Sequence, residues 1–232
     1  MNPPRLSRDS RRQQIVDCAL PLFAQNGFAG TTTKRIADAA GISEALLFKH
    51  FPSKSAVYSA ILTDVCEADP GLMRLRALAP STRTLVIFMR GMINWFFGTP
   101  GPAERNEKLR LVLSSQLEDG EFAQVLFDKV EQHVAPVFID SLKAAIASGE
   151  ARASEASPRD LFWFAHHTLS MLAASLLPRV PPLSFPPPAQ FEREVREFLL
   201  RGIGLDDAAI AAYADCEMPR ELLSEFCSLE SA

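Results

Sequence analysis

Apolar residues recur at three- and four-residue spacing through most of the chain, a pattern typical of amphipathic helices. The first helix is expected from about Arg8 to Asn26, where Gly27 ends it, and a later one from Lys54 to about Glu67. Further helices are predicted over residues 82–97, 103–117, 121–148, 158–177 and 189–201, the third of these kinked at Pro136. Pro- and Gly-rich loops are expected at 98–102 and 178–188. The pattern predicts an all-α fold.

Two short helices joined by a tight turn are predicted between residues 32 and 50. Thr32 can cap the first helix and Ser43 the second, because a hydroxyl accepts from the orphan N–H groups of a first turn. Gly41 stands where the chain needs a left-handed backbone. The first helix has a small apolar face at Ile36, Ala37 and Ala40. This arrangement is that of a helix-turn-helix, and an ordinary αα-hairpin in a helical core is the alternative.

Flanking residues extend the motif in both directions. Leu22-Phe23-Ala24-Gln25-Asn26-Gly27-Phe28 and Thr31-Thr32-Thr33 precede it, and Phe51-Pro52-Ser53-Lys54 follow it. Together these segments, about a quarter of the chain, resemble the N-terminal domain of the TetR family of bacterial transcription regulators. The resemblance implies a three-helix DNA-binding domain over residues 1–55 and a larger helical domain over 56–232 for effector binding and dimerisation. The rest of the chain resembles the family only in its helical pattern and length.

The distribution of charge fits a DNA-binding N-terminal segment. The whole chain has a formal net charge of −4. Residues 1–56 contain eight basic side chains and four acidic ones, a net +4, which leaves −8 on the remainder. Such asymmetry is typical of a DNA-facing head on an acidic body, although a basic segment can also be no more than a solvated face.

Candidate DNA contacts follow from the position of each residue in the motif. The expected contacts are Thr33, Lys34, Ser43, Glu44, Ala45, Phe48, Lys49, His50 and Lys54. Thr33 stands at a helix N-terminus, which favours a phosphate. Glu44 and Ala45 open the recognition helix, where Glu44 either accepts from a cytosine amino group or only complements the helix dipole. The resemblance implies a backbone contact for Lys54.

One residue departs from the family pattern. Position 48, usually Tyr in the family, is Phe here, so a hydroxyl contact with a phosphate is excluded at this position. Phe48 is expected instead to pack on a sugar or a thymine methyl group.

Composition and motif content argue against a metalloprotein, a disulfide-linked protein, a membrane protein and an enzyme. The four cysteines are widely spaced without a CxxC pair, so we expect a reduced, cytoplasmic protein with neither a zinc site nor a disulfide framework. No cofactor or metal is expected. The longest apolar run, 161–177, contains His166 and His167 and is shorter than the roughly 20 residues that span a bilayer. A helical-bundle enzyme is the weak alternative, because no Glu-x-x-His pair, nucleophile motif or Gly-rich phosphate loop occurs.

The C-terminal two thirds suggest a dimer with an effector site. The helix over 158–177 is apolar nearly all round, so a second subunit is expected to cover its outer face. The resemblance implies a four-helix homodimer interface made by the helices near 158–177 and 189–201. Candidate effector contacts are Trp95, Gln116, Phe127, His133, Trp163 and His167, for an apolar or aromatic small molecule. The alternatives are that these residues are simply core, and that the protein is a ligand-independent architectural DNA binder.

Overall fold

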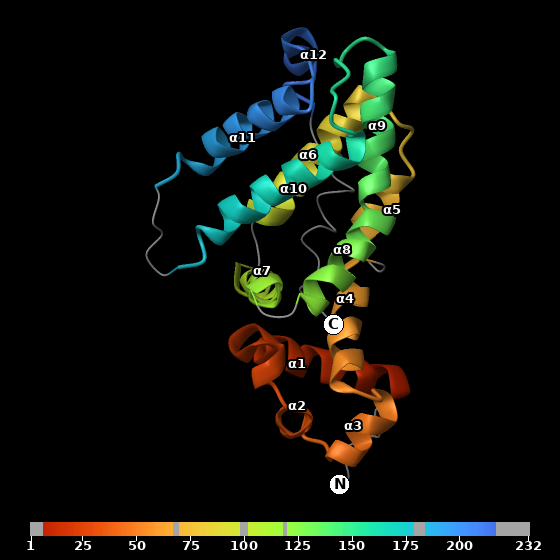
Figure 1. The fold of residues 1–232 in the computed structure, drawn as a ribbon, viewed down its shortest axis with the longest axis vertical. Helices are drawn as coiled ribbons and strands as arrows, with labels where there is room; N and C mark the ends of the chain where they lie inside the picture. The colour runs from red at the N-terminus through yellow and green to blue at the C-terminus, as the bar shows by residue number, and fades with distance from the viewer. Residues whose placement is uncertain (1–6, 67–69, 98–101, 118–119, 179–183, 217–232) are drawn as a thin grey trace. The chain divides into compact units, whose positions relative to one another are not determined.

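The protein is all-α in the computed structural model, which describes residues 7–66, 70–97, 102–117, 120–178 and 184–216 (Figure 1). The predicted fold class is therefore confirmed. An isolated β-bridge joins Ala151 to Leu205. No helix formed by the described residues is long and apolar enough to cross a membrane. Most of the expected loop at 98–102, the middle of that at 178–188, and a weak helical pattern at 222–226 lie outside these residues.

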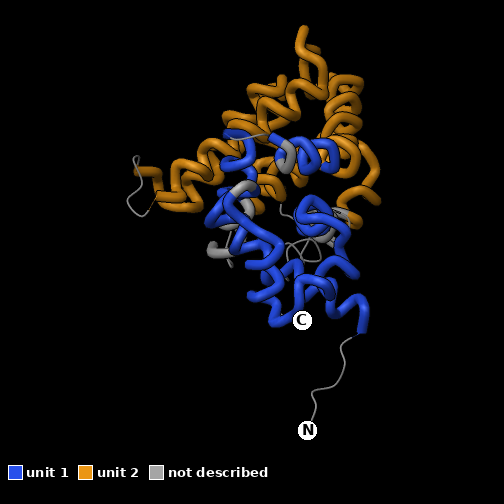
Figure 2. The backbone as a smooth tube through the Cα atoms, turned by 60° about the horizontal axis from the view of Figure 1, so that its bottom comes forward, with its two compact units in different colours: residues 1–68, 103–129 blue, residues 69–102, 130–232 orange. Residues whose placement is uncertain are grey.

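The chain folds as two compact units, each assembled from separate stretches of sequence (Figure 2). Unit 1 comprises residues 1–68 and 103–129, and unit 2 comprises residues 69–102 and 130–232. The expected functional boundary after residue 55 falls inside α4, the helix Lys54–Cys66, and stays a prediction.

Unit 1 is built on α1 and α4, with the two helices of the motif beside them. Its helices are α1 (Arg8–Gly30), α2 (Thr33–Ala39), α3 (Glu44–His50), α4, α7 (Pro102–Leu117) and most of α8 (Glu121–His133). The core is one cluster of buried side chains that includes Phe23, Leu47 and Val57, and Leu111 of α7 belongs to it. The ring of Tyr58 lies 4.7 Å from that of Phe23 between centroids. The predicted helices 32–50 thus pack into a shared core.

The end of α1 differs from the prediction. Gly27 leaves the helical region as expected, with φ 68° and ψ 177°, but helical structure resumes and continues to Gly30. The buried Thr31 hydroxyl lies within hydrogen-bonding distance of the carbonyls of Leu22 (3.0 Å) and Gly27 (2.9 Å). The hydroxyl has one hydrogen, so it donates to one of these carbonyls at a time and offsets part of what the break at Gly27 costs.

Unit 2 is organised around α6 (Thr82–Phe97), against which three other helices pack. They are α9 (Ala135–Ala147), α10 (Pro158–Ala174) and α11 (Pro188–Gly202). The rings of Phe88, Phe138 and Phe162 meet at centroid distances of 5.6–6.2 Å in the fully buried core. Edge and tilted ring contacts of this kind add to the stabilisation from area burial.

Several boundaries in this half were predicted wrongly. The expected kinked helix over 121–148 is two helices, α8 and α9, separated at Val134. Pro136 lies in the first turn of α9, where its missing N–H costs nothing, rather than inside a longer helix. The short helix α5 (Pro70–Arg76) was not predicted, and α12 (Asp207–Ala212) forms where the sequence has only a weak helical pattern, at 208–213. The helix expected to reach residue 177 ends at Ala174.

A carboxylate ties three distant parts of unit 2 together. Glu150 accepts hydrogen bonds from Thr82 Oγ1 (2.5 Å), Ser148 Oγ (2.9 Å) and the Tyr213 hydroxyl (3.2 Å). These donors, Thr82 first, hold the pKa of Glu150 below its ordinary value. The charged form is therefore the one that the fold stabilises.

Candidate DNA-binding site

The helix-turn-helix is set by short-range capping. Thr32 Oγ1 accepts from the Arg35 amide (3.2 Å), and Ser43 Oγ accepts from the Leu46 amide (3.2 Å). Gly41 has φ 65° in the turn between them, a conformation that a β-carbon disfavours. Both predicted caps and the predicted role of Gly41 are present in the structure.

The inner faces of α2 and α3 fix how α3 is presented. Ile36, Ala37 and Ala40 are buried on α2, and Leu47 is the fully buried side chain of α3. The small side chains at 37 and 40 let the helices approach closely. Because Leu47 faces inward, the residues at other positions around α3 face outward.

The N-terminal half of α3 offers an exposed surface. Ser43, Glu44 and Ala45 are exposed, and Phe48 and Lys49 are exposed one turn later. Phe48 shows 46% of its surface to solvent, a large value for a Phe beside a hydrophobic core. Thr33 Oγ1 donates to the Glu44 carboxylate, which links the start of α2 to the start of α3. The arrangement can approach base edges with Glu44, Ala45 and Phe48.

Two of the basic residues are used inside the fold. Lys54 Nζ donates to the carbonyls of Phe28 (2.5 Å) and Thr31 (2.9 Å) and lies 4.0 Å from the centre of the Phe28 ring. Arg12 Nη1 donates to the His50 carbonyl at the end of α3 (2.5 Å) and lies 4.1 Å from the Phe51 ring centre. Each cation therefore satisfies carbonyls near a helix end, where positive charge also suits the helix dipole.

His50 is held in a setting that disfavours its charged form. Burial is the first cause that lowers its pKa, and the neighbouring Arg8, Arg12 and Arg11 lower it further. A neutral imidazole is the consequence at neutral pH. In contrast, Lys34 and Lys49 are exposed and form no ion pair or side-chain hydrogen bond with other described residues. On α2 and α3, the side chains of Lys34 and Lys49 are therefore free to bind a phosphate.

The candidate effector residues are divided between the units. Gln116 and Phe127 belong to unit 1, and the other four, Trp95, His133, Trp163 and His167, belong to unit 2. Within unit 2, the indole N–H of Trp163 donates to Glu131 Oε2 (2.6 Å), and Arg159 donates to the same carboxylate. Among the described residues, no group of three His, Cys, Asp or Glu side chains is placed to hold a metal ion.

Sequence reasoning missed the residues that brace the motif from outside it. Arg12 lies on α1, 38 positions before its carbonyl partner, so no local spacing reveals the contact. Lys54 was assigned by resemblance to DNA backbone contact, while its ammonium here bonds to two main-chain carbonyls. A Phe that could pair with each cation was the one feature of the sequence that could have indicated these contacts. The chain has 16 Phe residues, so this feature does not identify the right partner.

A tight turn between two capped helices, with an exposed face on the second helix, is typical of a helix-turn-helix DNA-binding protein. The model of the bacterial regulatory proteins of the tetR family matches residues 15–61, which include the whole motif. Residues 15–61 therefore match the DNA-binding domain of the tetR family, and the chain is similar to transcription regulators of that family.

Individual relatives show how far the similarity extends. The HTH-type transcriptional repressor Rv1474c of Mycobacterium tuberculosis is 29% identical over 167 residues, 63% of this chain and 89% of that protein. The transcriptional repressor KstR2 of Rhodococcus jostii is 41% identical over 66 residues, 27% of this chain and 32% of that protein. The higher identity is thus confined to a segment about as long as the N-terminal part of unit 1.

Solved structures extend the likeness in fold to about nine tenths of the chain. A TetR-family transcriptional regulator from Mesorhizobium loti is similar with a TM-score of 0.59 at 14% identity, over 90% of this chain and 98% of that one. RolR in complex with resorcinol has a TM-score of 0.55 at 15% identity, over 92% of this chain and 97% of that one. Identities this low indicate a shared fold and do not extend to the ligand.

Proposed function

We propose that the protein is a dimeric repressor that binds a pseudo-palindromic operator and is released by a small apolar or aromatic molecule. The observation that carries the proposal is the exposed face of α3, with Glu44, Ala45, Phe48 and Lys49 open to solvent above the buried Leu47. Two copies related by a two-fold axis would present two such helices to successive major grooves.

The contacts divide into base readout and phosphate binding. Ser43, Glu44, Ala45 and Phe48 face the base edges, where Glu44 accepts from cytosine and Phe48 packs on a thymine methyl or a sugar. Lys34, Lys49 and Thr33 bind phosphates, the last at the N-terminus of α2. His50 is neutral at neutral pH and contributes at most a hydrogen bond. Lys54 supports DNA binding indirectly. Its ammonium bonds to the carbonyls of Phe28 and Thr31, which holds the segment before α2 in place, and it does not bind a phosphate.

Dimer formation is supported by apolar side chains left open on two helices of unit 2. Phe164 and Met171 of α10 are 63% and 64% exposed, and Phe198 of α11 is 67% exposed. The opposite face of α10 is buried against α6 and α9. Surface of this kind on two helices that both pack against α6 is typical of an interface between subunits.

The effector proposal rests on the aromatic content of unit 2. Trp95 contacts Phe96, Phe96 contacts His166, and His166 contacts Trp163, with centroid distances of 4.8–5.5 Å. A ligand that inserts among these rings would find apolar surface with few polar groups to orient it. RolR, which shares the fold, binds resorcinol, an aromatic compound.

DNA binding is tested by anisotropy on a duplex selected from a randomised library, measured over a range of KCl concentrations. Lys49→Ala is expected to weaken binding to all sequences and to reduce the salt slope by about 0.9 for each lost phosphate contact. Lys143→Ala, an exposed lysine of α9, is the matched control and should leave the slope unchanged. A selection that enriches no sequence would overturn the proposal of specific operator binding.

The dimer is tested separately by sedimentation velocity. Phe198→Glu is expected to shift the protein toward monomer, because the new carboxylate would be buried against an apolar partner surface. Leu117→Glu makes the same chemical change at a side chain 88% exposed on α7, and is expected to leave the dimer intact. Equal behaviour of the two variants would remove α11 from the interface.

A further inference from the structure

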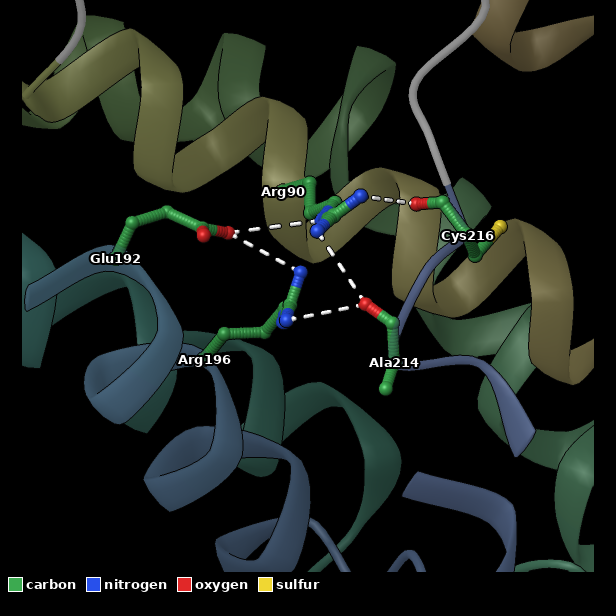
Figure 3. Close-up of polar contacts among 5 residues, drawn as sticks. All are labelled: Arg90, Glu192, Arg196, Ala214 and Cys216. Carbon is green, nitrogen blue, oxygen red and sulfur yellow. Dashed lines mark hydrogen bonds and ion pairs between the residues drawn. The ribbon is translucent and has the colours of Figure 1, made fainter. Parts of the chain in front are cut away.

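Two arginines from different helices converge between α6 and α11 in unit 2 (Figure 3). Arg90 comes from α6 and Arg196 from α11, and both approach Glu192 and the chain that follows α12. The Arg90 Nε lies 3.6 Å from Glu192 Oε1, and the Arg196 Nη1 lies 3.3 Å from the same oxygen. One carboxylate oxygen therefore serves two guanidinium groups.

The charges in this cluster do not balance. Two positive groups form ion pairs with the single carboxylate of Glu192. Of the other carboxylates on α11, Glu194 accepts from Gln190, and Glu197, which also acts on Arg196, pairs with Arg201 at 3.2 Å. Arg196 is buried, with 5% of its surface exposed, and burial is the first cause that lowers its pKa. Holding this charge away from water is costly unless strong acceptors surround it. The cluster consequently favours one further negative charge.

Main-chain carbonyls lie where a further negatively charged group would contact the two arginines. The Ala214 carbonyl accepts from Arg90 Nη2 (3.4 Å) and from Arg196 Nη2 (3.3 Å). The Cys216 carbonyl accepts from Arg90 Nη1. Two oxygens thus stand against the two terminal nitrogens of Arg90, as the two oxygens of a carboxylate stand against a guanidinium fork. Neutral carbonyls are weaker partners for such a fork than a carboxylate is.

Side chains hold this segment only loosely. Ala209 and Ile210 of α12 are the last buried side chains before it. Ala214 and Asp215 are exposed, and Cys216 is half-buried. The amides of Ala214 and Cys216 also donate to the carbonyls of Ala211 and Tyr213. The carbonyl contacts with the two arginines are the ones that join residues 214–216 to α6 and α11, and a competing anion has little side-chain packing to displace there.

We propose that Arg90 and Arg196 form a binding site for a small monocarboxylate, which competes with the carbonyls of Ala214 and Cys216 and displaces this segment. A single negative charge matches the single excess positive charge, whereas a dianion such as phosphate exceeds it and is repelled more strongly by Glu192. The proposal does not depend on DNA binding, so either can fail without the other.

The test uses the full-length protein with sodium benzoate as the probe, benzamide as its neutral isostere, and sodium phosphate at equal ionic strength. Binding is followed by calorimetry, and hydrogen exchange is followed in the peptide that covers residues 207–216. Benzoate is expected to bind and to raise exchange in residues 214–216, while benzamide does neither. Arg90→Gln should weaken benzoate binding about tenfold or more, because both fork contacts are lost. Arg83→Gln, which removes an exposed charge from the same helix, is the matched control.

The outcomes separate the alternatives. If Arg90→Gln does not fold, Arg90→Lys keeps the charge without the fork and should still lose most of the affinity. Benzoate binding that leaves exchange unchanged, or that Arg90→Gln and Arg83→Gln weaken equally, would overturn the site. Phosphate binding as tight as benzoate binding would overturn the choice of a monocarboxylate, and absence of benzoate binding would assign the cluster to structure alone.

Discussion

Replacing Lys54 by Met separates a structural role from a DNA-contact role at one residue. Methionine keeps the length and apolar stem of the side chain but removes the ammonium. The ammonium bonds to the Phe28 and Thr31 carbonyls and lies over the Phe28 ring. Phe28 lies in the last turn of α1 and Thr31 lies just before the N-cap of α2, so Lys54 fixes the connection that leads into the motif.

The expected loss of stability can be worked from these contacts. Hydrogen bonds to a charged group contribute about 1.5–3 kcal/mol when well buried, and a cation–π contact about 0.5–1 kcal/mol at exposed sites. Lys54 is only half-buried and water can reach the freed carbonyls, so the expected total is smaller, about 2 kcal/mol. For a protein of this size that corresponds to a fall in Tm of about 4–8 °C.

The assay pairs thermal unfolding with DNA binding over a salt series, using Lys49→Met as the control. Lys54→Met is expected to lower the Tm and to weaken DNA binding without changing the salt slope. Lys49→Met, which removes an exposed cation, is expected to leave the Tm unchanged and to reduce the slope by about 0.9 per phosphate contact. An unchanged Tm with a reduced slope in Lys54→Met would refute the reasoning and restore a phosphate contact.

Three further predictions concern stability. Gly41→Ala should lower the free energy of unfolding in urea by about 1–2 kcal/mol, because Ala must adopt φ 65°. Gly202→Ala, in a helix, is the control and should not destabilise the protein; equal losses in the two variants would contradict the prediction. Burial lowers the pKa of His166 to about 3, so between pH 6.5 and 3 the unfolded chain binds more protons and stability falls as pH falls. About 1.4 kcal/mol should be lost per pH unit there, and His166→Phe, unlike His167→Phe, should flatten this dependence in urea titrations. The lowered pKa of Glu150 means that its contribution is present above the ordinary Glu pKa and lost as pH falls below it, so Glu150→Gln should reduce the Tm at pH 7 more than at pH 3.5.

Local chemistry made the motif predictable. The caps at Thr32 and Ser43 and the turn at Gly41 each depend on residues no more than three positions away, so the sequence alone specifies them. Ser157 likewise accepts from the Asp160 amide at the predicted start of α10. Contacts of this range are set by residue type and spacing.

Contacts between distant segments were not predictable in the same way. The bond from Arg12 to the His50 carbonyl and the bond from Lys54 to the Phe28 carbonyl depend on how helices pack, and a charge count cannot distinguish them from DNA contacts. Periodicity predicted the helix over 103–117, which contains Leu111, but not the core that Leu111 joins. The expected helix over 121–148 was too long because its pattern continues across Val134.

The discontinuous construction of unit 1 also has a consequence for how the chain folds during synthesis. Its core includes Leu111, Val112 and Ala123 beside residues of α1 to α4, yet α5 and α6 of unit 2 are made in between. At about 5–20 residues per second, the ribosome needs about 3–12 s to extend the chain from residue 68 to residue 129. During that interval the helix-turn-helix has its caps and its turn but only part of its hydrophobic support. The DNA-binding unit of a nascent chain therefore reaches its full stability only after more than half of the protein has been translated.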